Sequence, residues 1–333
     1  MARVLVTRRL PDGGLDPLVA AGHEIVEPGA ADACVAEPGA AGPVAPGDRA
    51  LSHEELLEAV RAVDAVVCLL TDRIDRHVLE AGAEGSLRVV ANVAVGYDNV
   101  DVAAASELDV AVCNTPGVLD ETTADLAFLL ILAASRLASE AERDLRAGEW
   151  LGWGITQYLG EDVHGAVLGL VGYGRIGRAV ARRAEGFGMA VLHHARRDTG
   201  VHGYTASLDD LLAGSDVVSL HVPLTDATRQ LLGARELARM KPTAVLVNTS
   251  RGPVVDEEAL ADALESGRLF AAGLDVYERE PEIHPRLLRA PRTVLLPHIG
   301  SATRATRTQM AQMAAAAVCE VLAGGRPANL VTG

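Results

Sequence analysis

Cysteine pairs, an excess of positive charge and long apolar runs are all missing from this sequence. Its 333 residues include 4 cysteines. They are scattered, with no C-x-x-C and no zinc-ligand spacing, so neither a disulfide framework nor a metal site is expected. The 30 lysines and arginines are outnumbered by 45 acidic residues, giving a net charge of −15. This argues against nucleic acids and anionic membranes as partners.

The N-terminal segment also lacks the apolar core of a signal peptide. The longest apolar run, Leu126 to Ala134, is about half a membrane span. Together with the unpaired cysteines, this predicts a cytoplasmic protein. Hydrophobic residues make up 49% of the chain, and its length allows two domains with full cores.

Apolar, strand-like runs alternate with helical patterns along the chain. Arg3 to Thr7, Ala65 to Leu69 and Leu87 to Val93 are predicted strands with helices between them, which implies a parallel sheet. Ser52-His53-Glu54-Glu55 has the pattern of a capping box at a helix start. Pro28 to Ala50 is rich in Ala, Gly and Pro and is predicted to be an inserted surface loop.

The chain is organised around VLGLVGYGRIG, Val167 to Gly177. An apolar run short enough for a buried strand leads into G-x-G-x-x-G, and a helical pattern follows and stops at Gly186. Gly172 would allow the tight turn, Gly174 the approach of a pyrophosphate, and Gly177 close packing of helix and strand. The helix N-terminus would then face the phosphates. The motif predicts dinucleotide binding.

The position of this motif predicts the domain organisation. Strand and helix patterns continue after it to a total of six strands, the count of a full dinucleotide domain. We therefore expect a Rossmann domain at 107–298, inserted into a substrate-binding domain built from 1–106 and 299–333. The predicted fold is α/β, with two parallel-sheet, Rossmann-like domains (one flavodoxin-like, one dinucleotide-binding) and the active cleft between them. A long helix, from about Glu121 to Arg146, is expected to connect them.

The end of the second strand of the Rossmann domain bears on the choice of cofactor. An acidic residue normally binds the ribose hydroxyl there, but this position is Ala195, followed by Arg196 and Arg197. Arginine suits a bidentate grip on a 2′-phosphate. The sequence therefore favours NADP(H), with NAD(H) possible. The alternative is a solvated basic turn with Asp198 just beyond.

Three motifs follow consecutive strands of the same sheet: NTSRG, GLDVYEREP and LPHIGSA. Each is ambiguous alone, because a strand-end Arg is usually a salt-bridge partner, a Glu before Pro a loop charge, and a His after Pro a structural residue. Since the carboxyl ends of parallel strands share one edge, Arg251, Glu280 and His298 together form a candidate catalytic set.

These motifs resemble the D-isomer-specific 2-hydroxyacid dehydrogenase family over nearly the whole chain apart from the insert. NVAVGYDNVD (from Asn92) and LTDRID (from Leu70) are most similar to glyoxylate/hydroxypyruvate reductases, and Glu149-Trp150 and Trp153 fit that subgroup. The resemblance implies an NAD(P)-dependent reduction of a small 2-keto acid to a 2-hydroxy acid. It also implies a homodimer, in which Trp153 either reaches the partner's site or packs in the dimer interface.

The resemblance implies roles for the catalytic set. Arg251 would bind the substrate carboxylate and polarise the carbonyl, and His298 would be the general acid. Glu280 would hold the imidazole and favour its protonated form. The backbone N–H groups of Val95 and Gly96 would also bind the carboxylate, with Leu70 lining the pocket.

The resemblance also implies cofactor contacts. Thr123 would contact the pyrophosphate, Asp275 would hold the carboxamide, and Pro223 would line the adenosine side. The remaining expected cofactor-binding residues are Gly172, Gly174, Arg175, Ile176, Gly177, Ala195, Arg196, Arg197, Val222, Thr249, Ser250, Arg251, His298 and Gly300.

Two rival functions stay open. One is another dehydrogenase of the family, such as an NAD-linked phosphoglycerate-type enzyme; formate-type enzymes carry Gln where this chain has Glu280. The other is a dinucleotide-sensing corepressor, which can keep the same Arg, Glu and His. The acidic charge and the reductase-like VGYDN turn disfavour the corepressor.

Overall fold

The structure, a computed structural model, describes residues 1–27 and 49–332. Most of the predicted surface insert lies outside the described residues. The chain forms two compact units: unit 1 is Met1–Leu119 with Ala302–Gly333, and unit 2 is Asp120–Ser301. Each is an α/β unit with a parallel sheet, which confirms the predicted fold class.

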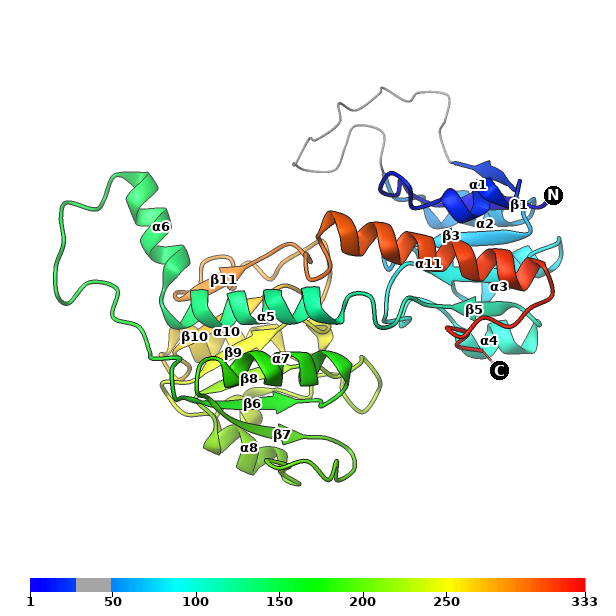
Figure 1. Cartoon of the computed structure of the whole chain (residues 1–333). Helices are drawn as coiled ribbons and strands as arrows, with labels where there is room; N and C mark the ends of the chain where they lie inside the picture. The colour runs from blue at the N-terminus through cyan, green and yellow to red at the C-terminus, as the bar shows by residue number, and fades with distance from the viewer. Residues whose placement is uncertain (28–48, 333) are drawn as a thin grey trace. The chain divides into compact units, whose positions relative to one another are not determined.

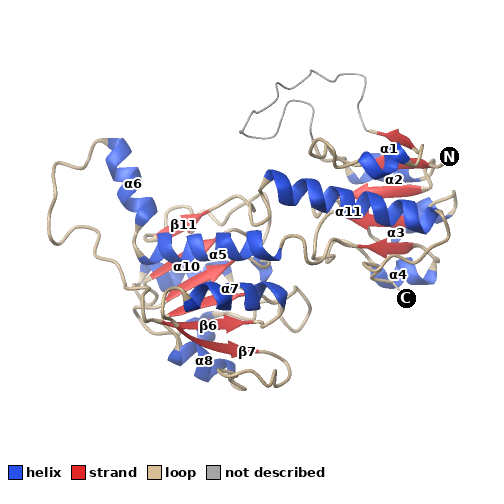
Figure 2. Ribbon diagram, viewed as in Figure 1, coloured by secondary structure: helices blue, strands red, loops and turns tan. Residues whose placement is uncertain are grey.

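Unit 1 is a five-stranded sheet in the order β2-β1-β3-β4-β5, the flavodoxin-like order (Figures 1 and 2). Its strands are β1 (Arg3–Val6), β2 (Glu24–Val26), β3 (Ala65–Cys68), β4 (Val89–Asn92) and β5 (Ala111–Cys113). Its helices are α1 (Asp16–Ala20), α2 (His53–Val60), α3 (Arg76–Ala83), α4 (Val102–Glu107) and α11 (Arg304–Leu322). The capping box predicted at Ser52 is present at the start of α2.

The unit boundaries differ from the expected ones because of two pairings within unit 1. β5 pairs with β4, with Cys113 opposite Ala91, so the segment after residue 106 stays in unit 1 up to Leu119. The C-terminal helix α11 packs on α1 and β4, and Gln312 Nε2 donates to Gly13 O at 3.0 Å. The second boundary falls at Ser301, just before this helix.

Unit 2 is a six-stranded sheet in the order β11-β10-β9-β8-β6-β7. Its strands are β6 (Val167–Val171), β7 (Ala190–His194), β8 (Val217–Leu220), β9 (Val245–Asn248), β10 (Ala271–Leu274) and β11 (Thr293–Leu295). Its helices are α5 (Asp120–Ser135), α6 (Ala138–Ala147), α7 (Arg175–Glu185), α8 (Leu208–Gly214), α9 (Ala234–Leu237) and α10 (Glu257–Glu265), with a 3₁₀ turn, η2 (Gly252–Val254).

Strand register brings the loops of unit 2 to one edge. β6 pairs with β7 on one side and β8 on the other, so the chain reverses direction across the sheet at β6. At the carboxyl ends, Leu274 of β10 lies opposite Asn248 of β9 and Leu295 of β11. The three motif loops that follow these strands therefore begin side by side.

The predicted long connecting helix is two helices, α5 and α6, bent by 66° (Figure 1). The break falls at Leu137, which has φ +53°. The returning chain ends α5, because Glu161 N donates to Ser135 O at 2.9 Å and a Cβ at Gly160 would lie 2.2 Å from that oxygen. In the described part of the chain no single helix is long and apolar enough to span a membrane, although this bent pair qualifies by length and composition.

Candidate active site

The glycine loop joins β6 to α7 and has little space around two of its glycines. Gly172 has φ +99°, and a Cβ there would lie 2.5 Å from His221 O. A Cβ at Gly177 would lie 2.3 Å from Gly172 O, whereas one at Gly174 would meet nothing within 4 Å. The first and third glycines are thus required by turn and packing, and the second leaves open space. Ile176 packs against the core beneath the loop.

The start of α7 fits an anionic group. No side chain caps the helix at Gly174, and its first turn holds no acidic residue, so the N-terminal N–H groups and the positive end of the helix dipole face open space. Across the sheet edge, Thr249 is 9% exposed, and its hydroxyl has no hydrogen-bond partner among the residues that the structure describes. An open cradle and an orphaned hydroxyl both suit the phosphates of a dinucleotide.

Strand β7 ends just before Ala195, and the two arginines that follow are exposed. Within residues 1–27 and 49–332, neither Arg196 nor Arg197 has a hydrogen-bond or ion-pair partner. The nearby Asp198 carboxylate instead accepts from Gly200 N at 2.9 Å. The turn therefore presents two uncompensated guanidinium groups rather than a closed salt-bridge cluster.

Residues beneath the glycine loop complete this edge. Val222 lies against it, since its Cγ1 would be 3.0 Å from a Cβ at Gly172. Pro223 is exposed, and its carbonyl accepts from Thr228 Oγ1 at 2.6 Å. Desolvation lowers the pKa of His221 to about 4, so this side chain, which sequence reasoning gave no role, is neutral near pH 7.

Asn248 shapes the loop that carries Arg251. Its side-chain oxygen accepts from Ser250 N at 3.0 Å and from Ser250 Oγ at 2.9 Å, while its Nδ2 donates to Arg251 O at 2.9 Å. The next residue allows no side chain, because a Cβ at Gly252 would lie 1.8 Å from the carbonyl carbon of Tyr277. The arginine loop therefore packs directly on the backbone of the loop after β10.

The loop after β10 is held at three points. Tyr277 N donates to Glu280 Oε1 at 3.0 Å, and Tyr277 Oη donates to Leu296 O at 2.9 Å. Glu278 N donates to Oε1 of Glu257, a residue 6% exposed at the start of α10, at 2.8 Å. Burial raises the pKa of Glu257, and the Glu278 N–H works against this rise. The Glu280–Pro281 bond that ends the loop is cis.

His298 and Glu280 come together in the structure. His298 Nδ1 lies 2.8 Å from Glu280 Oε2, with the side chains 25% and 28% exposed. Burial acts to raise the pKa of Glu280, but the hydrogen bond and charge of His298, with smaller contributions from the Tyr277 N–H and the Arg251 charge, hold that pKa below its usual value. Because Nδ1 is engaged, Nε2 is the imidazole nitrogen available to exchange a proton.

Asp275 and Thr123 lie behind this pair. Asp275 is 1% exposed and accepts from Ile299 N at 2.7 Å and Gly300 N at 2.8 Å. A Cβ at Gly300 would lie 3.5 Å from Thr123 Cγ2, so α5 packs against the same turn. The structure thus brings Thr123, Asp275, His298 and Gly300 together.

Leu70, Val95 and Gly96 belong to unit 1. Asn114 Nδ2 donates to Val95 O at 2.8 Å and Asn92 Nδ2 to Gly96 O at 2.9 Å. The two carbonyls are therefore bound, while the N–H groups of these residues donate to no other group in the described part of the chain.

Sequence reasoning missed two residues that support the site, Glu257 and Tyr277. Glu257 stands in DEEAL, which reads as ordinary acidic residues at a helix start, and Asp256 does cap α10 by accepting from Ala259 N at 3.0 Å. Tyr277 belongs to the GLDVYEREP motif, but its two hydrogen bonds depend on the tertiary fold.

The described residues hold no group of three or more His, Cys, Asp or Glu placed to bind a metal ion.

The chain is similar to known proteins in sequence and in structure. The sequence model of the D-isomer-specific 2-hydroxyacid dehydrogenase NAD-binding domain matches residues 128–300. A glyoxylate reductase of Korarchaeum cryptofilum is 50% identical over 84% of this chain and 86% of its own. A Thermus thermophilus protein of known crystal structure has a TM-score of 0.88 at 43% identity, covering 99% of this chain and 100% of its own.

A further solved structure contains a cofactor. It is an NADPH-dependent glyoxylate/hydroxypyruvate reductase of Sinorhizobium meliloti in complex with NADP and malonate. It has a TM-score of 0.82 at 33% identity, covering 99% of this chain and 96% of its own.

The Glu257 contact predicts a stability difference between two adjacent carboxylates. Glu257→Ala leaves the part-buried Glu278 N–H without its acceptor and should lower the free energy of unfolding by about 1–3 kcal/mol. Glu258→Ala removes an exposed carboxylate from the same turn and should change it by less than about 0.5 kcal/mol. Urea unfolding of both variants measures this, and equal losses would contradict the role given to Glu257.

Proposed function

Because the chain belongs to the D-isomer-specific 2-hydroxyacid dehydrogenase family, we propose that it is an NADPH-preferring reductase of small 2-keto acids of the glyoxylate and hydroxypyruvate type, with D-2-hydroxy acids as products. It is an NAD(P)-dependent oxidoreductase acting on CH–OH donors. The observation that carries the proposal is the 2.8 Å contact of His298 with Glu280, next to the Arg251 loop and on the sheet that bears the dinucleotide motif.

We assign substrate binding to charged and backbone donors. Arg251 binds the carboxylate of the 2-keto acid and polarises the C2 carbonyl, since a guanidinium forms short, charge-assisted hydrogen bonds to both oxygens. The N–H groups of Val95 and Gly96 bind the carboxylate as well, and Leu70 contacts the apolar part of the substrate. Two bound carbonyls support this, because a carbonyl lies in one plane with the N–H of the next residue. Ala94 O accepts from Thr115 N at 2.9 Å and Val95 O accepts from Asn114 Nδ2 at 2.8 Å, which fixes the directions of the Val95 and Gly96 N–H groups.

We assign the proton to His298. The bound nicotinamide supplies the hydride that C2 receives. The protonated imidazole donates from Nε2 to the carbonyl oxygen, which prevents the build-up of alkoxide charge. Glu280 accepts from Nδ1, and its negative charge stabilises the imidazolium that donates the proton.

The residues around the glycine loop hold the cofactor in this proposal. The N–H groups of the Gly172–Gly177 turn and Arg175 bind the pyrophosphate, with Thr123 and the Thr249 hydroxyl as further donors. Asp275 holds the carboxamide. Val222 and Pro223 line the adenosine side, and Ser250 and Gly300 complete the wall of the site.

The preference for NADPH rests on the turn after β7. Ala195 provides no acceptor for a ribose hydroxyl, and Arg196 and Arg197 are exposed without partners in the described structure. A 2′-phosphate carries the charge and the oxygen geometry that such guanidinium groups bind.

A homodimer is part of the proposal. Beyond α6 the chain runs through a long segment that extends away from the sheet of unit 2 (Figure 1), and it exposes large apolar side chains. These include Leu151 at 96%, Trp153 at 79%, Ile155 at 75% and Leu159 at 65%. An apolar segment of this kind marks an association surface. We propose that a second copy of the chain covers it, with Trp153 in or near the partner's site.

Replacement of the general acid should abolish reduction without abolishing cofactor binding. For His298→Ala we expect kcat with glyoxylate or hydroxypyruvate and NADPH to fall about 10²–10⁴-fold. Fluorescence titration with NADPH tests that the variant is folded and binds cofactor. Near-wild-type turnover would refute the assignment, and wild-type protein inactive on a full panel of 2-keto acids would favour a dinucleotide-binding protein.

Removal of the Glu280 charge should shift the pH profile. Glu280→Gln keeps an acceptor for His298 Nδ1 but loses the negative charge that favours the imidazolium. Reduction requires the imidazolium, so the fall in kcat/KM at rising pH should move to lower pH. Glu282→Gln, an exposed change in the same loop, should leave the profile in place, and an unshifted Glu280→Gln profile would contradict the pairing.

Cofactor choice should depend on the arginine turn. Arg196→Ala removes a 2′-phosphate contact, so kcat/KM for NADPH should fall by about tenfold or more while that for NADH changes little. Arg286→Ala, which breaks an ion pair with Asp262 on α10, controls for general loss of positive charge. An NADH preference in the wild-type protein would overturn the NADPH assignment.

A further inference from the structure

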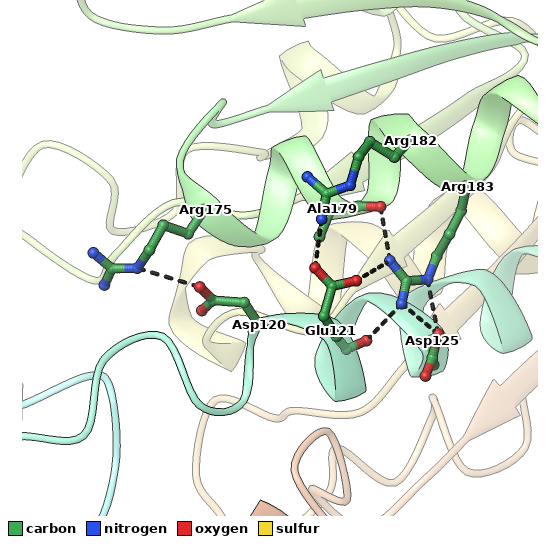
Figure 3. A network of polar contacts seen from close by, with 7 residues as sticks. All are labelled: Asp120, Glu121, Asp125, Arg175, Ala179, Arg182 and Arg183. Atoms are coloured by element: carbon green, nitrogen blue, oxygen red, sulfur yellow. Dashed lines mark hydrogen bonds and ion pairs between the residues drawn. The ribbon is translucent and has the colours of Figure 1, made fainter.

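The first turns of α5 face α7 through a row of opposite charges, and Arg182 and Arg183 contribute from the last turn of α7 (Figure 3). Glu121 pairs with Arg182 and Arg183, and Asp125 pairs with Arg183 at 2.6 Å. Arg183 also donates to Ala179 O at 2.9 Å. These contacts lie along the helices beyond the glycine loop and fasten α5 to α7.

Asp120 is different, because its partner stands in the glycine loop itself. Arg175, the first residue of α7, directly follows Gly174, and its Nε lies 3.3 Å from Asp120 Oδ2. Figure 3 shows the terminal nitrogens of Arg175 on the side away from Asp120. They have no partner in the described part of the chain, and the side chain is 62% exposed.

The Asp120 carboxylate is held in an unusual setting for an acid. The residue is 9% exposed, and Oδ1 has no hydrogen-bond partner among the described residues. Burial raises the pKa of Asp120, the Arg175 charge lowers it, and Glu121 raises it. A desolvated carboxylate is stabilised by a neighbouring cation. The Asp120 charge therefore holds the Arg175 side chain beside it.

We propose that Asp120 is a positioning residue for dinucleotide binding. By holding Nε, it leaves the two terminal amino groups of Arg175 turned toward the open space in front of α7, where they are able to form a fork to a phosphate. A side chain that is already ordered loses less conformational entropy when the ligand binds. The inference rests on the proposed role of Arg175 as a pyrophosphate contact.

The effect should be seen in affinity and should be the same for both cofactors, because they share the pyrophosphate. For Asp120→Ala we expect the Kd values of NADPH and NADH, measured by fluorescence titration or calorimetry, to rise about threefold to tenfold. Asp120→Asn keeps the shape of the side chain but loses the charge that pairs with Nε, so it should raise both Kd values much as Asp120→Ala does. Glu121→Ala removes the neighbouring carboxylate, which does not touch Arg175, and should leave both Kd values unchanged.

A double-mutant cycle tests whether Asp120 acts through Arg175. Arg175→Gln alone should raise both Kd values, and Asp120→Ala should add nothing in that background. A Kd unchanged or lowered by Asp120→Ala, an equal rise in the Arg175→Gln background, or an Arg175→Gln protein with wild-type affinity would each overturn the proposal. Failure of the proposed function is seen separately, as a wild-type protein that binds neither NADPH nor NADH.

Discussion

The candidate site depends on the carboxylate of Asp275, which fixes the turn after β11. It accepts from Ile299 N at 2.7 Å and Gly300 N at 2.8 Å, immediately after His298, whose φ is +54°. A residue with a Cβ keeps such a conformation only where its surroundings over-determine it. Burial raises the pKa of Asp275 to about 6 although these N–H groups act to lower it. The two hydrogen bonds thus stabilise both the charged carboxylate and the position of the imidazole.

A second constraint is the close approach of neighbouring loops. Parallel strands deliver their loops to one edge, but they do not by themselves bring side chains into contact. Tyr277 does so here: its backbone occupies the space that any Cβ on Gly252 would need, its N–H holds Glu280, and its hydroxyl reaches Leu296 O. One residue therefore links the loops of Arg251, Glu280 and His298, and a shift of any one loop would be transmitted to the other two.

Features encoded by local pattern could be predicted from the sequence, and features decided by distant contacts could not. The fold class, the six strands of unit 2 and the glycine loop follow from apolar periodicity and glycine spacing. The motifs also pointed to Glu280 and His298, which the structure places in contact. No glycine or proline at Leu137 marks the helix break. The break depends on a later segment of the chain, in which Gly160 and Glu161 contact Ser135 and end the helix. Likewise, nothing in DEEAL distinguishes Glu257 from the neighbouring acidic residues, because its burial depends on the tertiary fold.

The net charge of the protein and the charges at the candidate cofactor site have opposite signs, and they affect different ligands. The net charge of −15 disfavours extended polyanions, whose many phosphates sense the average field of the surface. A dinucleotide offers only a few phosphates and senses the groups within a few ångströms, since exposed charges beyond about 8–10 Å are screened. Where α5 and α7 meet, Arg182 and Arg183 of α7 form ion pairs with carboxylates of α5. Arg175 keeps its terminal nitrogens free, and Arg196 and Arg197 are wholly uncompensated in the described structure. Arg175, Arg196 and Arg197 thus present positive charge at the sheet edge that carries the dinucleotide motif, in a protein of negative net charge.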